Sequence, residues 1–151
     1  MRHVLSNPNP PSMPRVLSMR ERDALTRQLL EERLDTLLPL AMAEADVDMW
    51  LIICQEDDLD PVFRTMIPMN TWCPILQMLI LARRPATGQV ERINLSMTRT
   101  RGLYVEPWAG RGEAEQWAAL VRTISDRDPA RIASYTGSVQ WAAGGLTHNL
   151  Y

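Results

Sequence analysis

Hydrophobic residues recur every three or four positions between residues 25 and 45, a spacing typical of an amphipathic helix. Ser18 and Glu21 precede this pattern at the spacing of a capping box, so we expect the helix to begin there. Pro39 lies inside the pattern and removes one backbone hydrogen bond, which predicts a kink or a break between residues 35 and 38. The predicted core face contains Leu25, Leu29, Leu34, Leu37, Leu38, Ala41 and Ala45.

The pattern then changes to short apolar runs that are typical of strands. Residues 50–54 are apolar at every position, as in a central strand covered by helices. Residues 75–84 and 90–97 flank a segment with Pro85 and Gly88, which predicts an antiparallel hairpin. Further strands are expected at residues 102–108 and 131–136.

Two more helices are predicted. A short one starts at Pro61 and ends before Pro68, and a longer one spans residues 113–126 before Pro129. On the longer helix, Trp117, Leu120, Val121 and Ile124 share one face. The order of helices and strands predicts an α/β fold, with a single domain and a mixed β-sheet flanked by helices.

The composition excludes several classes of protein. A chain of 151 residues suits one domain with one core, and its net charge of -2 gives no electrostatic reason to bind nucleic acid or an anionic membrane. The longest apolar runs are far shorter than a bilayer span. The Pro-rich opening has no apolar core of a signal peptide, so we expect residues 1–17 to form a flexible arm and the protein to be cytoplasmic.

A cluster of carboxylates directly follows the apolar run 50–54. Glu56, Asp57, Asp58 and Asp60 could hold a hard cation, but they lack the alternating pattern of a calcium-binding loop. Asp60 precedes Pro61, a good N-cap followed by a good first helical residue. We therefore expect this acidic loop to cap a helix and to remain solvated.

Other candidate chemistry is sparse. His3 and His148 form no HxH or HxxxH pair, and Cys54 and Cys73 have no CxxC partner, so the cysteines are expected to be reduced and partly buried. The chain contains no nucleophile elbow and no Gly-rich phosphate loop. We predict no catalytic, cofactor-binding or metal-binding residue in this chain.

The loop PMNTWCP, residues 68–74, is the strongest candidate for a binding surface. Its two prolines stiffen it, Asn70 and Thr71 offer hydrogen bonds, and Trp72 offers a broad apolar surface. These residues could contact a peptide or a partner subunit, or Trp72 could fold back onto the local core. Other apolar residues in or beside loops, with a core position as the alternative for each, are Met66, Met69, Trp108 and Trp141.

Two long strings resemble a known family. RVLSMRERDALTRQLLEERLDTLLPLAMAEADVDMWLIICQEDDLDPVF, residues 15–63, and RIASYTGSVQWAAGGLTHNLY, residues 131–151, resemble the N-terminal domain of the creatinase, prolidase and Xaa-Pro aminopeptidase family of pita-bread metallohydrolases. Residues 66–111 match by element order more than by residue. SYTGSVQW, residues 134–141, departs from the regular segment that the family would have.

The resemblance implies a creatinase N-terminal-like domain at residues 18–151, with a ribonuclease H-like motif and no catalytic role. It places two Asp, one His and two Glu, which hold two divalent metals, in a separate C-terminal catalytic domain absent from this chain. The expected partners are that domain and further copies in a homo-oligomer. Asn70, Thr71, Trp72 and Trp108 are the candidates for a substrate entrance or an interface.

Alternatives remain open at this point. The chain could be a stand-alone binding or oligomerisation module of the same fold, or a small cation-binding domain that uses the acidic loop. The substrate of a parent enzyme could be an Xaa-Pro peptide or a creatine-like molecule. The final GGLTHNLY resembles a loop leading into another element, so we expect a cut or a domain boundary there.

Overall fold

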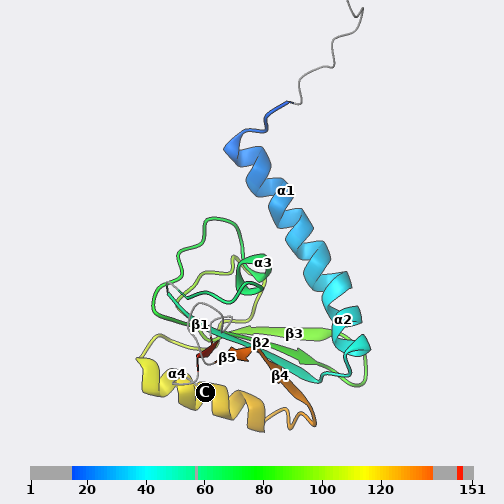
Figure 1. Cartoon of the computed structure of the whole chain (residues 1–151), viewed down its shortest axis with the longest axis vertical. Helices are drawn as coiled ribbons and strands as arrows, with labels where there is room; N and C mark the ends of the chain where they lie inside the picture. The colour runs from blue at the N-terminus through cyan, green and yellow to red at the C-terminus, as the bar shows by residue number, and fades with distance from the viewer. Residues whose placement is uncertain (1–14, 57, 138–145, 148–151) are drawn as a thin grey trace, which may run out of the picture.

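A long helix lies across a mixed sheet that carries a second helix on its other face (Figure 1). The computed structural model describes residues 15–56, 58–137 and 146–147. Most of the expected arm and of the GGLTHNLY segment thus lies outside the described residues. The elements are α1 Met19–Glu32, η1 Arg33–Leu37, α2 Leu38–Glu44, β1 Met49–Gln55, α3 Phe63–Met66, β2 Leu76–Arg83, β3 Val90–Asn94, α4 Glu113–Ser125, β4 Ile132–Ser134, β5 Thr136–Gly137 and β6 Leu146–Thr147.

The main sheet has four strands in the order β3-β2-β1-β4. β1 pairs antiparallel with β2 and parallel with β4, while β2 pairs antiparallel with β3, which confirms the predicted hairpin and the central place of β1. β5 and β6 form a separate parallel pair. The chain is a single α/β domain with a mixed sheet and helices, as predicted.

The strand expected at residues 102–108 is wrong. Val105 alone bridges to Ile93, donating its N–H to the Arg92 carbonyl and accepting from the Asn94 N–H. The chain does not extend this pairing because Gly102 adopts φ 83° in a turn and Pro107 has no N–H to donate.

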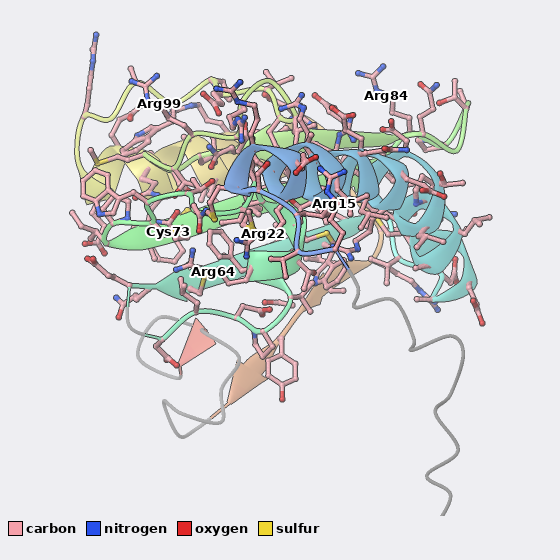
Figure 2. The ribbon with its side chains drawn as sticks, turned by 90° about the horizontal axis from the view of Figure 1, so that it is seen from above. Arg15, Arg22, Arg64, Cys73, Arg84 and Arg99 are labelled. Atoms are coloured by element: carbon pink, nitrogen blue, oxygen red, sulfur yellow. The ribbon has the colours of Figure 1, made fainter. Side chains whose placement is uncertain are left out.

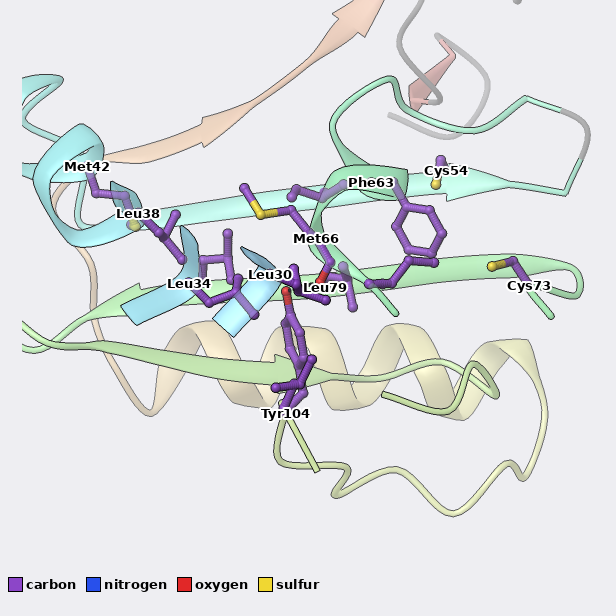
Figure 3. Packing of buried hydrophobic residues seen from close by; sticks show 14 residues of the cluster. Leu30, Leu34, Leu38, Met42, Cys54, Phe63, Met66, Cys73, Leu79 and Tyr104 are labelled. Atoms are coloured by element: carbon purple, nitrogen blue, oxygen red, sulfur yellow. Dashed lines mark hydrogen bonds between the residues drawn. The ribbon is translucent and has the colours of Figure 1, made fainter. Parts of the chain in front are cut away.

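Alternating residues of β1 and β2 build a core on each face of the sheet. Ile52 and Leu79 point to a cluster with the long helix and α3, shown in Figure 3. Ile53 and Ile80 point to the opposite cluster, which α4 covers. Both faces of the central strands are therefore buried, which explains why β1 and β2 are apolar at nearly every position.

A capping box begins α1, as the sequence predicts. Ser18 donates its backbone N–H to the Glu21 carboxylate at 2.8 Å, and the Ser18 hydroxyl accepts the Glu21 N–H at 3.3 Å. These bonds satisfy two backbone groups at the helix start and lower the pKa of the Glu21 carboxyl.

We expect Ser18→Ala to lower the free energy of unfolding by about 1 kcal/mol, because an N-cap side chain is lost. Urea denaturation followed by circular dichroism measures the change. Ser125→Ala is the matched control, since Ser125 is exposed and its side chain makes no hydrogen bond within the described residues. Equal stability of the two variants would contradict the capping role.

Pro39 lies just after a π-helical turn, η1, where the sequence predicts a kink or a break. The Leu38 N–H donates to the Arg33 carbonyl, five residues back, instead of the carbonyl four residues back. This wider turn accommodates the proline, which has no N–H and whose ring crowds the preceding turn. The helix therefore widens at the predicted position and continues to Glu44.

The predicted core face of this helix is only partly correct. Leu34 and Leu38 are buried, but the other buried residues are Leu30 and Met42. The predicted residues that are exposed are Leu25, Leu29, Leu37, Ala41 and Ala45. Apolar residues lie on two sides of the helix, and periodicity alone does not tell which side meets the sheet.

A similar correction applies to α4. Leu120 is buried, and Trp117 and Ile124 are partly buried against the sheet, but Val121 is 61% exposed. Buried Gln116 occupies the core face instead, where its amide donates to the Leu76 and Leu95 carbonyls. The two hydrogen bonds donated by this buried amide thus join α4 to the sheet.

Candidate functional site

The loop between α3 and β2 presents Trp72 to solvent. Its side chain is 70% exposed, so Trp72 does not fold back onto the core. Met97, which is 52% exposed, comes from the segment after β3 and lines the same cavity of about 440 Å³. We call the residues that line this cavity the Trp72 surface. They are Met69, Asn70, Thr71, Trp72, Met97, Arg99 and Arg101.

Hydrogen bonds hold the backbone of the Trp72 loop. The Thr71 hydroxyl donates to the Pro68 carbonyl at 2.7 Å, which closes a turn. The Thr98 hydroxyl lies 3.3 Å from the Trp72 carbonyl and also contacts the buried Gln77 amide oxygen. Gln77 in turn donates to the Pro74 carbonyl. The loop is thereby joined both to β2 and to the segment after β3.

A buried polar network supports this segment. The Asn94 amide donates to the Thr98 carbonyl at 2.6 Å and accepts the Ser96 N–H at 3.0 Å. The Ser96 hydroxyl accepts the Met78 N–H at 2.7 Å. Because these groups are buried, breaking one hydrogen bond leaves a polar atom with neither a protein partner nor water to bond. The network therefore favours one loop conformation.

Three residues in or beside the Trp72 surface have left-handed backbone: Asn70 at φ 59°, Ile75 at φ 52° and Arg101 at φ 55°. Asn tolerates this region, whereas a β-branched residue such as Ile rarely adopts it. Glu56 holds Ile75 in place, because its N–H donates to the Ile75 carbonyl at 2.8 Å and its carboxylate accepts the Ile75 N–H at 3.2 Å. Backbone strain is often concentrated at binding sites.

Arginines surround the exposed apolar side chains. Arg64 donates to the Thr71 carbonyl and contacts the Cys73 sulfur at 3.5 Å, at one end of the sheet in Figure 2. Arg101 is bound by both carboxylate oxygens of Asp23. Arg99 is exposed and forms no ion pair within the described ranges. The Trp72 surface can therefore contact an apolar group with Trp72 and Met97 and a carboxylate with Arg99.

The structure does not bring Trp108 to this surface. Trp108 is partly buried against the α4-side cluster, and its indole Nε1 is buried without a hydrogen-bond partner in the described part of the chain. Met66 is a core residue that is 6% exposed, whereas Met69 is half-buried and lines the Trp72 surface. Trp141 lies outside the described residues.

Asp60 closes the turn that precedes α3, but two parts of the prediction are wrong: α3 begins at Phe63 with Val62 at the N-cap position instead of at Pro61, and Asp60 is buried instead of solvated. The buried Asp60 carboxylate accepts the Val62 N–H at 2.7 Å and the Phe63 N–H at 3.3 Å, and burial raises its pKa. Asp57 lies outside the described residues. Within the described ranges, no group of three or more His, Cys, Asp or Glu side chains is arranged to hold a metal ion.

Both cysteines are free thiols and are buried. Burial raises the pKa of the Cys54 thiol to about 12, which keeps it protonated and unreactive at neutral pH.

Among the helices that the structure describes, none is long and apolar enough to cross a bilayer.

Comparison with protein-family models, with curated proteins and with solved structures found no match to this chain. The contributions of Met97, Arg99 and Arg101 to the Trp72 surface are absent from the sequence predictions. No local signal identifies them, because Met97 and Arg99 reach Trp72 only through the pairing of β2 with β3.

Proposed function

We propose that this chain is the non-catalytic N-terminal domain of an Xaa-Pro aminopeptidase- or prolidase-like metallopeptidase, with a creatinase N-terminal-like fold. In this proposal, the Trp72 surface lines the substrate entrance of the assembled enzyme. The observation that carries this role is the 70% exposed Trp72 on a loop held by hydrogen bonds from Thr98 and Gln77. The family assignment is supported by the sequence strings at residues 15–63 and 131–151.

The chemistry of the surface suits a short peptide. An indole face favours contact with an apolar or prolyl side chain, and the nearby Arg99 guanidinium favours a terminal carboxylate. A loop that is already ordered loses little conformational entropy when a peptide binds. The hydrolytic residues and the two divalent metals belong to the expected C-terminal domain, which is also the expected partner of this chain.

The second candidate is a stand-alone binding or oligomerisation module of the same fold. The exposed side chains of Trp72 and Met97 would then cover a protein partner. The gene sequence downstream of Tyr151 separates the two candidates: a following series of Asp, Asp, His, Glu and Glu ligands supports the peptidase, and its absence supports the module.

We expect Trp72→Ala in the full-length parent enzyme to raise KM for Xaa-Pro peptides about five- to tenfold, because an apolar contact with the substrate is lost. The melting temperature should stay unchanged, since the side chain is exposed. Steady-state kinetics and thermal denaturation measure the two effects.

Trp117→Ala is the matched control, because Trp117 packs against the sheet on the α4 side. This control should lower the melting temperature and leave KM unchanged. If Trp72→Ala instead lowers the melting temperature by several degrees with unchanged kinetics, Trp72 has a structural role and the entrance proposal is refuted.

A further inference from the structure

The long helix has an apolar face that no described element covers. Leu25, Leu29, Leu37 and Leu40 are 44%, 49%, 58% and 64% exposed. In α1, only Leu30 is buried, and Figure 1 shows this helix extending past the sheet. A helix with leucines on an uncovered side exposes an apolar stripe that is typical of an interaction surface.

The π-helical turn keeps this stripe on one side of the helix. In a regular α-helix, two residues that are eight positions apart point in directions that differ by about 80° around the helix axis. The wider turn in η1 takes up one extra residue, so Leu37 returns to the side of Leu29 while Leu30 and Leu38 both remain on the sheet side. Pro39 therefore affects both apolar faces of the helix.

A row of positions spaced by four along this side of the helix is symmetric about Arg33, and Leu40 lies next to this row. Counting by fours from Leu25 gives Leu29, Arg33, Leu37 and Ala41. In an antiparallel pair of helices centred on Arg33, Leu29 lies opposite Leu37 of the second copy, and Leu25 lies opposite its Ala41. The Arg33 guanidinium donates to the Thr65 carbonyl, so it points towards the body of its own domain and away from the centre of the helix pair.

Charges at the two ends of the stripe complement each other in the same arrangement. Arg22 lies three residues before Leu25, and Glu44 lies three residues after Ala41. Both are exposed, and neither has an ion-pair partner within the described ranges. In an antiparallel pair, Arg22 of each copy lies next to Glu44 of the other copy. In a parallel pair, like charges would lie together.

The length of the helix suits such a pairing. α1, η1 and α2 have 14, 5 and 7 residues, so the continuous helix is about 39 Å long. Figure 2 shows Arg22 on α1 and Arg15 in the segment before it; α1 crosses the sheet with this side of the domain uncovered.

We propose that the chain forms a symmetric dimer in which the α1–α2 helices of two copies pair antiparallel through Leu25, Leu29, Leu37 and Leu40. The occupant of the uncovered stripe is a second copy of this chain. This surface is distinct from the Trp72 surface, and the proposal does not rest on the peptidase assignment. The dimer proposal is tested by measuring the oligomeric state, whereas the entrance proposal is tested by KM and melting temperature. Either proposal can therefore fail without the other.

Sedimentation velocity over a range of protein concentrations tests the dimer. We expect the wild-type chain to dimerise and Leu29→Glu or Leu37→Glu to weaken dimerisation about a hundredfold, because each change occurs twice in a symmetric pair. Val121→Glu is the matched control, since Val121 is 61% exposed on α4 and outside the stripe; it should dimerise as the wild type does. Circular dichroism verifies the helical content of each variant.

A charge reversal tests the antiparallel register. Arg22→Glu and Glu44→Arg should each weaken dimerisation about fivefold, and the double variant should restore it, because each end again pairs opposite charges. A wild-type chain that stays monomeric at every concentration, or a Leu29→Glu variant that dimerises as strongly as the wild type, overturns the proposal. A double variant that is weaker than both single variants overturns the antiparallel arrangement.

Discussion

Replacing Phe63 by alanine should lower the free energy of unfolding by about 4 kcal/mol, the largest effect that we expect from one substitution. Phe63 is 0% exposed and fills the space between α3 and the sheet, in the cluster shown in Figure 3. Its removal leaves a cavity, because α3 has only four residues and the Asp60 carboxylate holds the Phe63 N–H at its start. A closely packed core relaxes only partly around a cavity of this kind.

Urea denaturation with two independent probes, far-ultraviolet circular dichroism and tryptophan fluorescence, measures this effect. Val121→Ala is the control for loss of an exposed apolar side chain and should change stability by less than about 0.5 kcal/mol. A loss below about 1 kcal/mol for Phe63→Ala would mean that α3 packs loosely on the sheet, contrary to the buried position described above.

Asn94→Ala should destabilise the protein by about 3 kcal/mol, although it removes a polar side chain. Asn94 is 0% exposed, and its loss leaves the Ser96 N–H and the Thr98 carbonyl buried without their side-chain partner. Each buried polar group without a partner costs about 1–3 kcal/mol. The change should also loosen residues 96–101, which contribute Met97 and Arg99 to the Trp72 surface.

Denaturation experiments give the loss of stability, and amide hydrogen exchange reports the loosening of residues 96–101. Gln89→Ala, at an exposed amide in the β2–β3 turn, is the control and should change neither quantity. Unchanged exchange in residues 96–101 of Asn94→Ala would show that the network does not hold the Trp72 surface.

Local chemistry explains which elements could be predicted. Ser18 and Glu21 make a capping box whichever way the helix packs, and Pro39 disturbs its own helix in any fold, so both features follow from neighbouring residues. The turn at Pro85–Gly88 and the apolar runs beside it likewise specify the hairpin of β2 and β3.

Local turn residues explain one error, and contacts between distant segments explain the other. Residues 102–108 include Val105, a residue type that is common in strands, but Gly102 and Pro107 limit the pairing to a single bridge at Val105. Val121 and Gln116 both lie on α4, and the polar one is buried because the Leu76 and Leu95 carbonyls need donors at that place. Hydrophobicity alone therefore predicts the wrong residue for the core.

The mixed α/β class, the helix start, the disturbance of the helix next to Pro39 and the hairpin could be predicted, because each depends on interactions within a few residues. Which leucine stripe of the long helix meets the sheet, and which stays exposed, depends on tertiary packing. Tertiary packing also placed Met97 and Arg99 beside Trp72 and held Ile75 in a left-handed conformation through Glu56. These features depend on strand pairing and on the satisfaction of buried polar groups, which residues far apart in the chain supply to one another.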